Sequence, residues 1–149
     1  MDPQAKSPPG RIVALDYGRR RIGVAASDPL RIIAKPRAVV AAGSPPIEPS
    51  RELLDLLAEL EPSVIVLGIP FNMDGSEGEM ALEAREFGRR LFAACAIPIR
   101  ERDERLSTVE AERTIRELGL PKHKREQKGL RDMMAAAVLL DDYMREDGT

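Results

Sequence analysis

The sequence predicts an α/β fold with one mixed five-stranded sheet, three antiparallel strands followed by parallel strands, and helices on both faces. Three observations predict it. The first third of the chain carries short strand-like segments joined by turns, and the remainder alternates between helical and strand-like segments. Residues 63–70, SVIVLGIP, form a continuous apolar run rich in β-branched residues, which is typical of a strand buried on both faces. Helices on both faces of a mixed sheet would supply that burial.

The first three strands are expected near the N-terminus. Residues 11–18, RIVALDYG, form an apolar run that ends in an acid and a glycine, so a strand breaks there into a turn. Residues 21–28 alternate between the two faces and predict a second strand, paired with the first in a hairpin around residues 18–20. A third strand is expected between residues 32 and 40, interrupted near Pro36 because proline lacks a backbone donor.

The rest of the chain predicts alternating helices and strands. Ser50 is a candidate N-cap for a helix that runs to about Glu61 and carries four leucines on one face. Asp74 and Gly75 give a strong turn signal after the buried strand. The remaining elements are a helix over about 77–94, a strand over 97–102, a helix over about 107–118, a basic loop over 120–128 and a helix over about 129–145.

The length and composition fit a single domain. The chain has 149 residues, of which 43% are hydrophobic and 32% charged, as in ordinary globular proteins. We expect residues 1–10, which contain three prolines and a glycine, to be a disordered leader, residues 11–145 to be one domain and residues 146–149 to be a tail.

The charge and the cysteine content limit the classes of function. A net charge of −2 argues against a protein that coats nucleic acid through overall positive charge, although local basic patches remain compatible with it. Cys95 is the single cysteine and agrees with a reducing compartment. With no long apolar run and no signal-peptide pattern, we expect a cytoplasmic protein that is neither secreted nor membrane-bound. Apolar helix faces leave a monomer or a weak homodimer open.

Three acidic positions stand out by their place in the predicted fold. Asp16 ends the first strand, Glu104 follows the fifth strand with Asp103 beside it, and Asp132 opens the last helix. Loops beyond strand ends converge in such sheets, and carboxylates gathered there repel one another unless they share a cation such as Mg²⁺ or Mn²⁺. Each acid also has a structural interpretation: a turn former at 16, an exposed salt-bridged turn at 103–105 and a favourable helix-dipole charge at 132.

Basic segments lie next to these acids in the sequence. Arg19, Arg20 and Arg21 occupy the first turn, close to Asp16. Such a cluster fits contacts with phosphate groups, and it equally fits the solvated tip of a hairpin. A second basic segment precedes Asp132 and contains Lys122, Lys124, Arg125 and Lys128. Two basic segments beside candidate metal ligands suggest a polyanionic substrate.

Four segments together resemble one protein family. In order, RIVALDYGRRRIGVAASD, VIVLGIPFNMDGSEG, RERDERLSTVEAE and KGLRDMMAAAVLLDDYM are similar to the signature blocks of the YqgF/RuvX family, over about residues 11–145. These are pre-rRNA-processing nucleases, also called Holliday-junction-resolvase-like proteins. The resemblance implies an RNase H-like fold and a nuclease dependent on Mg²⁺ or Mn²⁺ that acts on structured RNA or branched DNA. Processing of the 5′ end of the 16S rRNA precursor is the expected role.

Carried over by position, the resemblance places the catalytic, metal-binding acids at Asp16, Glu104 and Asp132, with Asp103 as a further neighbour. RNase H-like sites usually hold a fourth carboxylate near the last one, whereas Met133, Met134 and Ala135 follow Asp132 here, so a second metal ion lacks an obvious ligand. The residues implied to contact nucleic acid are Arg19, Arg20, Arg21, Asn72, Arg105, Lys122, Lys124, Arg125 and Lys128.

Other functions remain open at this point. The implied chemistry is compatible with a resolvase of Holliday junctions, and a catalytically weak scaffold that binds nucleic acid would keep the same fold. An actin- or hexokinase-like ATPase shares the hairpin with an aspartate and a glycine at its turn, but this chain has no second phosphate-binding loop.

Overall fold

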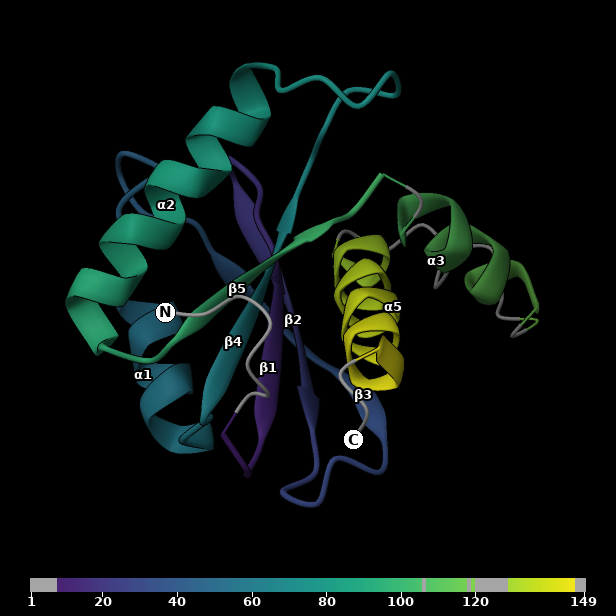
Figure 1. Ribbon diagram of the computed structural model, residues 1–149, viewed down its shortest axis with the longest axis horizontal. Helices are drawn as coiled ribbons and strands as arrows, with labels where there is room; N and C mark the ends of the chain where they lie inside the picture. Colours follow the sequence, from purple (N-terminus) through teal and green to yellow (C-terminus); the bar gives the residue numbers. More distant parts are fainter. Residues whose placement is uncertain (1–7, 106, 118, 120–128, 147–149) are drawn as a thin grey trace.

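The computed structural model describes residues 8–105, 107–117, 119 and 129–146. Its centre is a five-stranded sheet in the order β3-β2-β1-β4-β5 (Figure 1). Neighbouring strands among β1, β2 and β3 are antiparallel, whereas β4 runs parallel to β1 and β5 runs parallel to β4. The predicted mixed sheet is therefore confirmed. The strands are β1 (Ile12–Asp16), β2 (Arg21–Ser27), β3 (Ala34–Ala41), β4 (Val64–Ile69) and β5 (Ile99–Asp103).

Helices cover both faces of the sheet, as predicted (Figure 1). Alternate residues of the central strands divide the core into two clusters, because successive side chains point to opposite faces. Val13 and Leu15 lie in the cluster with α1 and α2, and Ile12 and Ala14 lie in the cluster with α5. The helices are α1 (Arg51–Leu60), α2 (Glu79–Cys95), α3 (Ser107–Glu117), which packs against α5, and α5 (Leu130–Glu146).

The expected interruption of the third strand is confirmed. Val24 pairs with Ala38 and Ala25 pairs with Pro36, so Arg37 has no partner in the register and forms a bulge. A bulge lets the edge strand accommodate the missing donor of Pro36. The bulge leaves the pairing of the central strands intact.

The ends of the first two helices follow local chemistry. Ser50 caps α1, as predicted: its hydroxyl oxygen accepts a hydrogen bond from the Leu53 backbone N–H at 3.1 Å. The second helix begins at residue 79 rather than 77 because the preceding turn continues to Gly78. It ends at Ala96, whose φ of 59° breaks the helix, so β5 begins at residue 99 rather than 97.

Residues 8–10, the described part of the expected N-terminal leader, contact the folded domain. Arg31, which is only 8% exposed, donates from Nε to the Gly10 carbonyl oxygen at 2.7 Å and from its guanidinium to the carbonyl of Pro8. Residues 8–10 are thus held against the loop between β2 and β3. Among the described helices, none is both long and apolar enough to cross a membrane.

Candidate active site

Asp16 and Glu104 meet at the carboxyl ends of adjacent strands. Asp16 is the last residue of β1, and Glu104 follows β5, on the other side of β4. The Glu104 backbone N–H donates to the carbonyl oxygen of Ile69 at 3.2 Å, which holds residue 104 against the end of β4. From there its side chain reaches across β4 and hydrogen-bonds the side chain of Asp16. Two acids that lie far apart in the sequence therefore form one partly buried carboxylate pair.

Glycines make room for this pair and for the helix beside it. A Cβ on Gly68 would lie 2.3 Å from Oε2 of Glu104, so any larger residue in β4 would collide with the carboxylate. A Cβ on Gly23 would lie 2.1 Å from the carbonyl oxygen of Asp132. Gly23 pairs with Asp16 across the hairpin, so it lets the start of α5 approach the strand end that carries Asp16.

Sequence reasoning did not identify either glycine as part of the site. A glycine inside a strand often marks a close approach of backbone or ligand, and both residues lie inside strands predicted from the sequence. A glycine inside a predicted strand was therefore visible in the sequence, but it does not show which group packs against it.

Burial raises the pKa of both carboxyls in the pair. For Glu104 the loss of water is the largest cause, and the negative charge of Asp16 and its hydrogen bond raise the pKa further, to about 10. For Asp16, burial raises the pKa to about 6, against the lowering effect of the hydrogen bond with Glu104, and the charge of Asp132 adds to the rise. Around neutral pH, Glu104 therefore holds a proton and donates it in the hydrogen bond that Asp16 accepts.

The third predicted acid lies near the pair and faces a cation. Asp132 is in the first turn of α5, and its Oδ2 accepts a hydrogen bond from Nε of Arg21 at 2.5 Å. Its charge nevertheless reaches Asp16. Within the described part of the chain, no group of three or more Asp, Glu, His or Cys side chains is gathered closely enough to hold a metal ion.

The chemistry of these donors fits a hard divalent cation. All three are carboxylates, the ligands that Mg²⁺ and Mn²⁺ prefer. Two carboxylates in contact repel each other unless a proton or a cation lies between them, and the raised pKa of Glu104 favours the proton when no cation is bound. Asp16, Glu104 and Asp132 are the residues that could hold such an ion.

Asp103 and Glu104 point in different directions. Asp103 is exposed and pairs with Arg105 at 2.7 Å, and the guanidinium lowers the pKa of the Asp103 carboxyl. The segment thus contains both features considered from its sequence: a salt-bridged exposed turn at 103 and 105, and an inward acid at 104. Arg105 also donates to the Met73 carbonyl oxygen at 3.3 Å.

The loop after β4 is a hydrogen-bonded turn. Asn72 donates from its side chain to the Ser76 hydroxyl at 2.9 Å, and Asp74 accepts from the Ser76 backbone N–H at 2.9 Å. Gly75 has a φ of 88° at the predicted turn. Asn72 therefore organises this loop, which Arg105 connects to the end of β5.

The predicted basic residues have different environments. Arg19 donates from Nε to Glu83 at 3.1 Å, and Glu83 also accepts from the Tyr17 hydroxyl at 2.7 Å, so the turn after β1 is attached to α2. Arg20 is exposed, and Arg21 contacts Asp132 as described. The predicted contacts at Lys122, Lys124, Arg125 and Lys128 lie outside the described residues.

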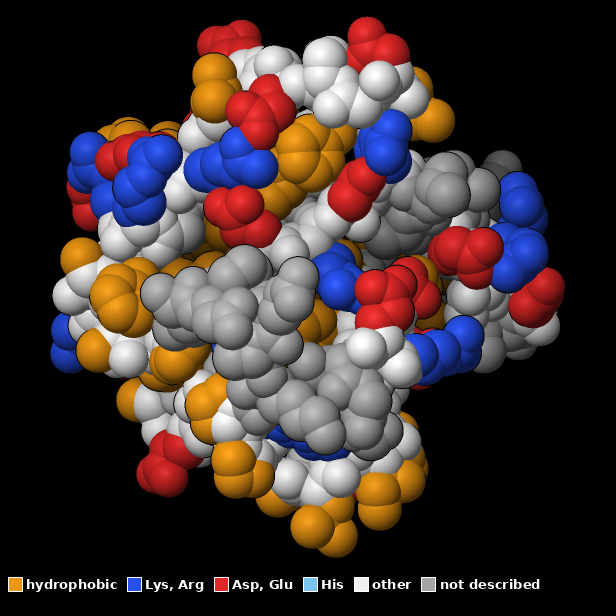
Figure 2. Space-filling view, viewed as in Figure 1, with side chains coloured by type: hydrophobic (Ala, Val, Ile, Leu, Met, Phe, Trp, Pro, Cys, Tyr) orange, Lys and Arg blue, Asp and Glu red, His pale blue; other side chains and the backbone are white. Residues whose placement is uncertain are grey.

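Charges of both signs alternate over the surface. Figure 2 shows Lys and Arg side chains next to Asp and Glu side chains on the face in view, in agreement with the many ion pairs. Phosphate groups therefore meet a mixed surface here rather than a uniformly basic one.

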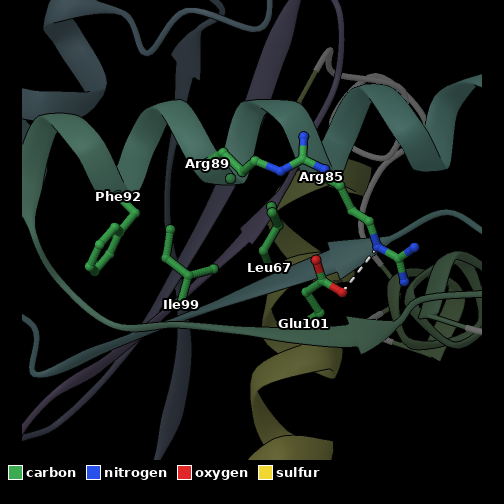
Figure 3. A pocket seen from close by; sticks show the side chains of 7 residues that line it. Leu67, Arg85, Arg89, Phe92, Ile99 and Glu101 are labelled. Atoms are coloured by element: carbon green, nitrogen blue, oxygen red, sulfur yellow. Dashed lines mark hydrogen bonds and ion pairs between the residues drawn. The ribbon is translucent and has the colours of Figure 1, made fainter. Parts of the chain in front are cut away.

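Two cavities in the described part of the chain lie away from the acids. One, of about 350 Å³, lies between α2 and β5 and is lined by Leu67, Phe92 and Ile99, with an ion pair between Arg85 and Glu101 at 3.1 Å (Figure 3). Leu67 belongs to the core cluster of α1 and α2, so this cavity opens on the opposite face of the sheet from α5. Another, of about 370 Å³, lies near Arg11 at the opposite end of β1 from Asp16. Neither includes the carboxylate pair.

Comparison with known proteins identifies a matching family and relatives of similar sequence. The model of the RuvX family, described as Holliday junction resolvase, matches residues 10–146. A protein of Halothermothrix orenii named "Putative pre-16S rRNA nuclease" is 42% identical over 134 residues, which cover 90% of this chain and 94% of that protein. A protein of a Roseiflexus species with the same name is 40% identical over 139 residues, 93% of this chain and 96% of its own.

Solved structures show the same fold. Thermus thermophilus RuvC in complex with a Holliday junction substrate has a TM-score of 0.53 and 20% identity, and the match covers 92% of this chain and 96% of RuvC. The yeast mitochondrial Holliday junction resolvase Ydc2 has a TM-score of 0.54 and 12% identity, with coverage of 97% and 81%. The expected RNase H-like fold is confirmed.

Proposed function

This chain belongs to the RuvX family, and from that premise we propose that it is a divalent-metal-dependent endonuclease that hydrolyses phosphodiester bonds in structured nucleic acid. The observation that carries the proposal is the partly buried pair of Asp16 and Glu104 at the strand ends on either side of β4, with Asp132 near it. Burying two carboxylates in contact is unfavourable for folding alone, so their retention fits a role in catalysis.

The substrate we propose is the precursor of 16S rRNA, cut at its 5′ end during ribosome biogenesis in the cytoplasm. The names of the relatives at 42% and 40% identity support this choice. Branched DNA is the second candidate, because the family model is described as Holliday junction resolvase.

The acids of this chain would act by holding the ion. Asp16, Glu104 and Asp132 would bind Mg²⁺ or Mn²⁺ through carboxylate oxygens, and Glu104 would give up its proton. When bound, the ion polarises the phosphoryl oxygen and lowers the pKa of the attacking water. Basic residues would hold flanking phosphates, which positions the scissile bond without providing base specificity. Those we propose are Arg19, Arg20, Arg21, Arg105, Lys122, Lys124, Arg125 and Lys128, with Asn72 at the same rim.

The test compares the wild-type protein with Asp16→Asn on two substrates, a 16S rRNA precursor and a four-way DNA junction. We expect cleavage of the precursor only with Mg²⁺ or Mn²⁺, and its loss in Asp16→Asn because the ion loses a ligand. Cleavage of the junction alone would favour the resolvase. Equal cleavage by both proteins would contradict the assigned site, and binding without cleavage by either would favour the scaffold.

A further inference from the structure

Arg21 forms an ion pair with Asp132, one of the three proposed metal ligands. Arg21 opens β2 and Asp132 lies in the first turn of α5, so the pair joins the sheet to the helix that covers it. Nε of Arg21 lies 2.5 Å from Oδ2 of Asp132, and their side chains are 40% and 25% exposed. This partial burial makes the charge-assisted hydrogen bond stronger than a fully exposed pair.

The backbone on both sides of this pair is fixed by close packing. Gly23 contacts the backbone of Asp132 so closely that even a Cβ would not fit. Gly129, one turn earlier, lies equally close to Val39 of β3, where a Cβ would be 2.6 Å from Cγ2. The start of α5 is therefore held on β2 and β3. With the backbone fixed, the Asp132 carboxylate can change direction only by rotation of its own side chain. The hydrogen bond from Arg21 stabilises one of these side-chain orientations.

Arg21 supplies the kind of charge that a metal ion would supply. A guanidinium does not lose its proton in proteins, so it is a permanent cation beside Asp132. Asp16 and Glu104, by contrast, hydrogen-bond each other. In the described residues the three acids do not form one metal-binding group, and Asp132 is the acid of the three that pairs with Arg21.

We propose that Arg21 is the resident counter-ion of Asp132 and competes with the divalent cation for this carboxylate, so that it weakens metal binding and is released when the metal binds. The inference rests on the proposed function, since it concerns the same acids. The release leaves a guanidinium at the rim of the site, where a substrate phosphate can accept its hydrogen bonds. Arg21 is thus a positioning residue: it acts on the metal through Asp132.

The first experiment measures Mn²⁺ binding by calorimetry, without nucleic acid, for the wild-type protein, Arg21→Gln, Arg21→Lys and Arg20→Gln. We expect Arg21→Gln to bind Mn²⁺ about 3- to 10-fold more tightly, as the loss of a partly buried, charge-assisted competitor implies. Arg20→Gln removes the same charge one residue away and controls for general electrostatic attraction; we expect less than about a 2-fold change. Arg21→Lys keeps a cationic donor and should remain close to wild type. Thermal unfolding establishes that each variant is folded.

The second experiment follows the Arg21 Nε–H signal in a ¹H–¹⁵N NMR spectrum of the wild-type protein, assigned by its loss in Arg21→Lys. We expect a hydrogen-bonded chemical shift without metal and the shift of a solvated arginine at saturating Mg²⁺.

The outcomes separate this inference from the proposed function. If the wild-type protein and Arg21→Gln bind Mn²⁺ equally, or Arg21→Gln binds more weakly, Arg21 does not compete and the inference is wrong while the metal site stands. An Nε–H signal that stays hydrogen-bonded at saturating Mg²⁺ would likewise overturn it. If neither protein binds Mn²⁺, the proposed metal-dependent function fails together with the inference. Binding by Arg21→Gln alone would support competition most directly.

Discussion

Replacing Glu104 with glutamine should stabilise the metal-free protein while removing its activity. Glutamine keeps the shape of the side chain and can still donate a hydrogen bond to Asp16, but it never has to take up a proton. In the wild-type protein, burial raises the pKa of Glu104 from 4.5 to about 10, so the folded state holds a proton that the unfolded state releases. Holding that proton costs free energy at neutral pH.

The size and sign follow from the two pKa values. Because the folded pKa is raised, the contribution of Glu104 to stability is full below pH 4.5 and is lost progressively as the pH rises toward 10. At about pH 7.5 the protein is three pH units into that window, and at 1.36 kcal/mol per unit the loss is at most about 4 kcal/mol. Allowing for the burial of the amide itself, we expect Glu104→Gln to raise the free energy of unfolding by about 1–4 kcal/mol.

The assay is chemical or thermal unfolding in EDTA at pH 7.5 and at pH 4. A gain of that size corresponds to an increase in Tm of roughly 3–12 °C at pH 7.5, and the two proteins should coincide at pH 4. Glu101→Gln is the matched control, in the strand that precedes Glu104: Glu101 is 45% exposed and pairs with Arg85, so its replacement should be neutral or slightly destabilising. A Glu104→Gln protein that is less stable than wild type at pH 7.5, or a gain that persists at pH 4, would refute the reasoning.

Two further predictions concern the same strand ends. Gly68→Ala should lower the free energy of unfolding by about 1–3 kcal/mol and also weaken Mg²⁺ binding, because the new Cβ would lie 2.3 Å from the Glu104 carboxylate and displace it. Urea unfolding measures the first effect and calorimetry the second. An unchanged Mg²⁺ affinity would contradict the role of Gly68. The increase in Tm produced by Mg²⁺ should grow from pH 6 to pH 9, since the ion must replace the proton on Glu104, whose pKa is about 10. Thermal scans at fixed Mg²⁺ across this range test it, and a shift independent of pH would show that no proton is displaced.

Much of the fold could be predicted because it depends on local patterns. The buried strand at 63–70, the Ser50 cap and the irregularity at Pro36 each follow from a few neighbouring residues, and the structure confirms them. Element boundaries were less accurate where a single backbone conformation decides them, as at Ala96, whose positive φ no sequence rule for alanine would predict.

The candidate site could be predicted only in part, because its geometry depends on pairings between distant segments. Asp16 was identifiable as the acid at a strand end. The family resemblance placed the catalytic acid at Glu104, but the sequence pattern alone could not decide which of Asp103 and Glu104 points inward, since that depends on the hydrogen bond between the Glu104 N–H and the end of β4. Nor could it assign Arg21 to Asp132, 111 positions away, rather than to a phosphate group.

The arginines around the acids suggest how a protein with a net charge of −2 could bind a polyanion. Arg19, Arg21 and Arg105 each pair with a carboxylate of the chain itself, at Glu83, Asp132 and Asp103. A phosphate group that binds one of them must replace that carboxylate, so the gain in affinity is smaller than for a solvated cation. When Arg105 is released, the Asp103 carboxylate returns to solvent. When Arg19 is released, Glu83 keeps its hydrogen bond from the Tyr17 hydroxyl. When Arg21 is released, the Asp132 carboxylate becomes available to the metal, and the exchange then favours catalysis as well as binding. Of the three pairs, Arg21–Asp132 is therefore the one in which nucleic-acid binding and metal binding would assist each other.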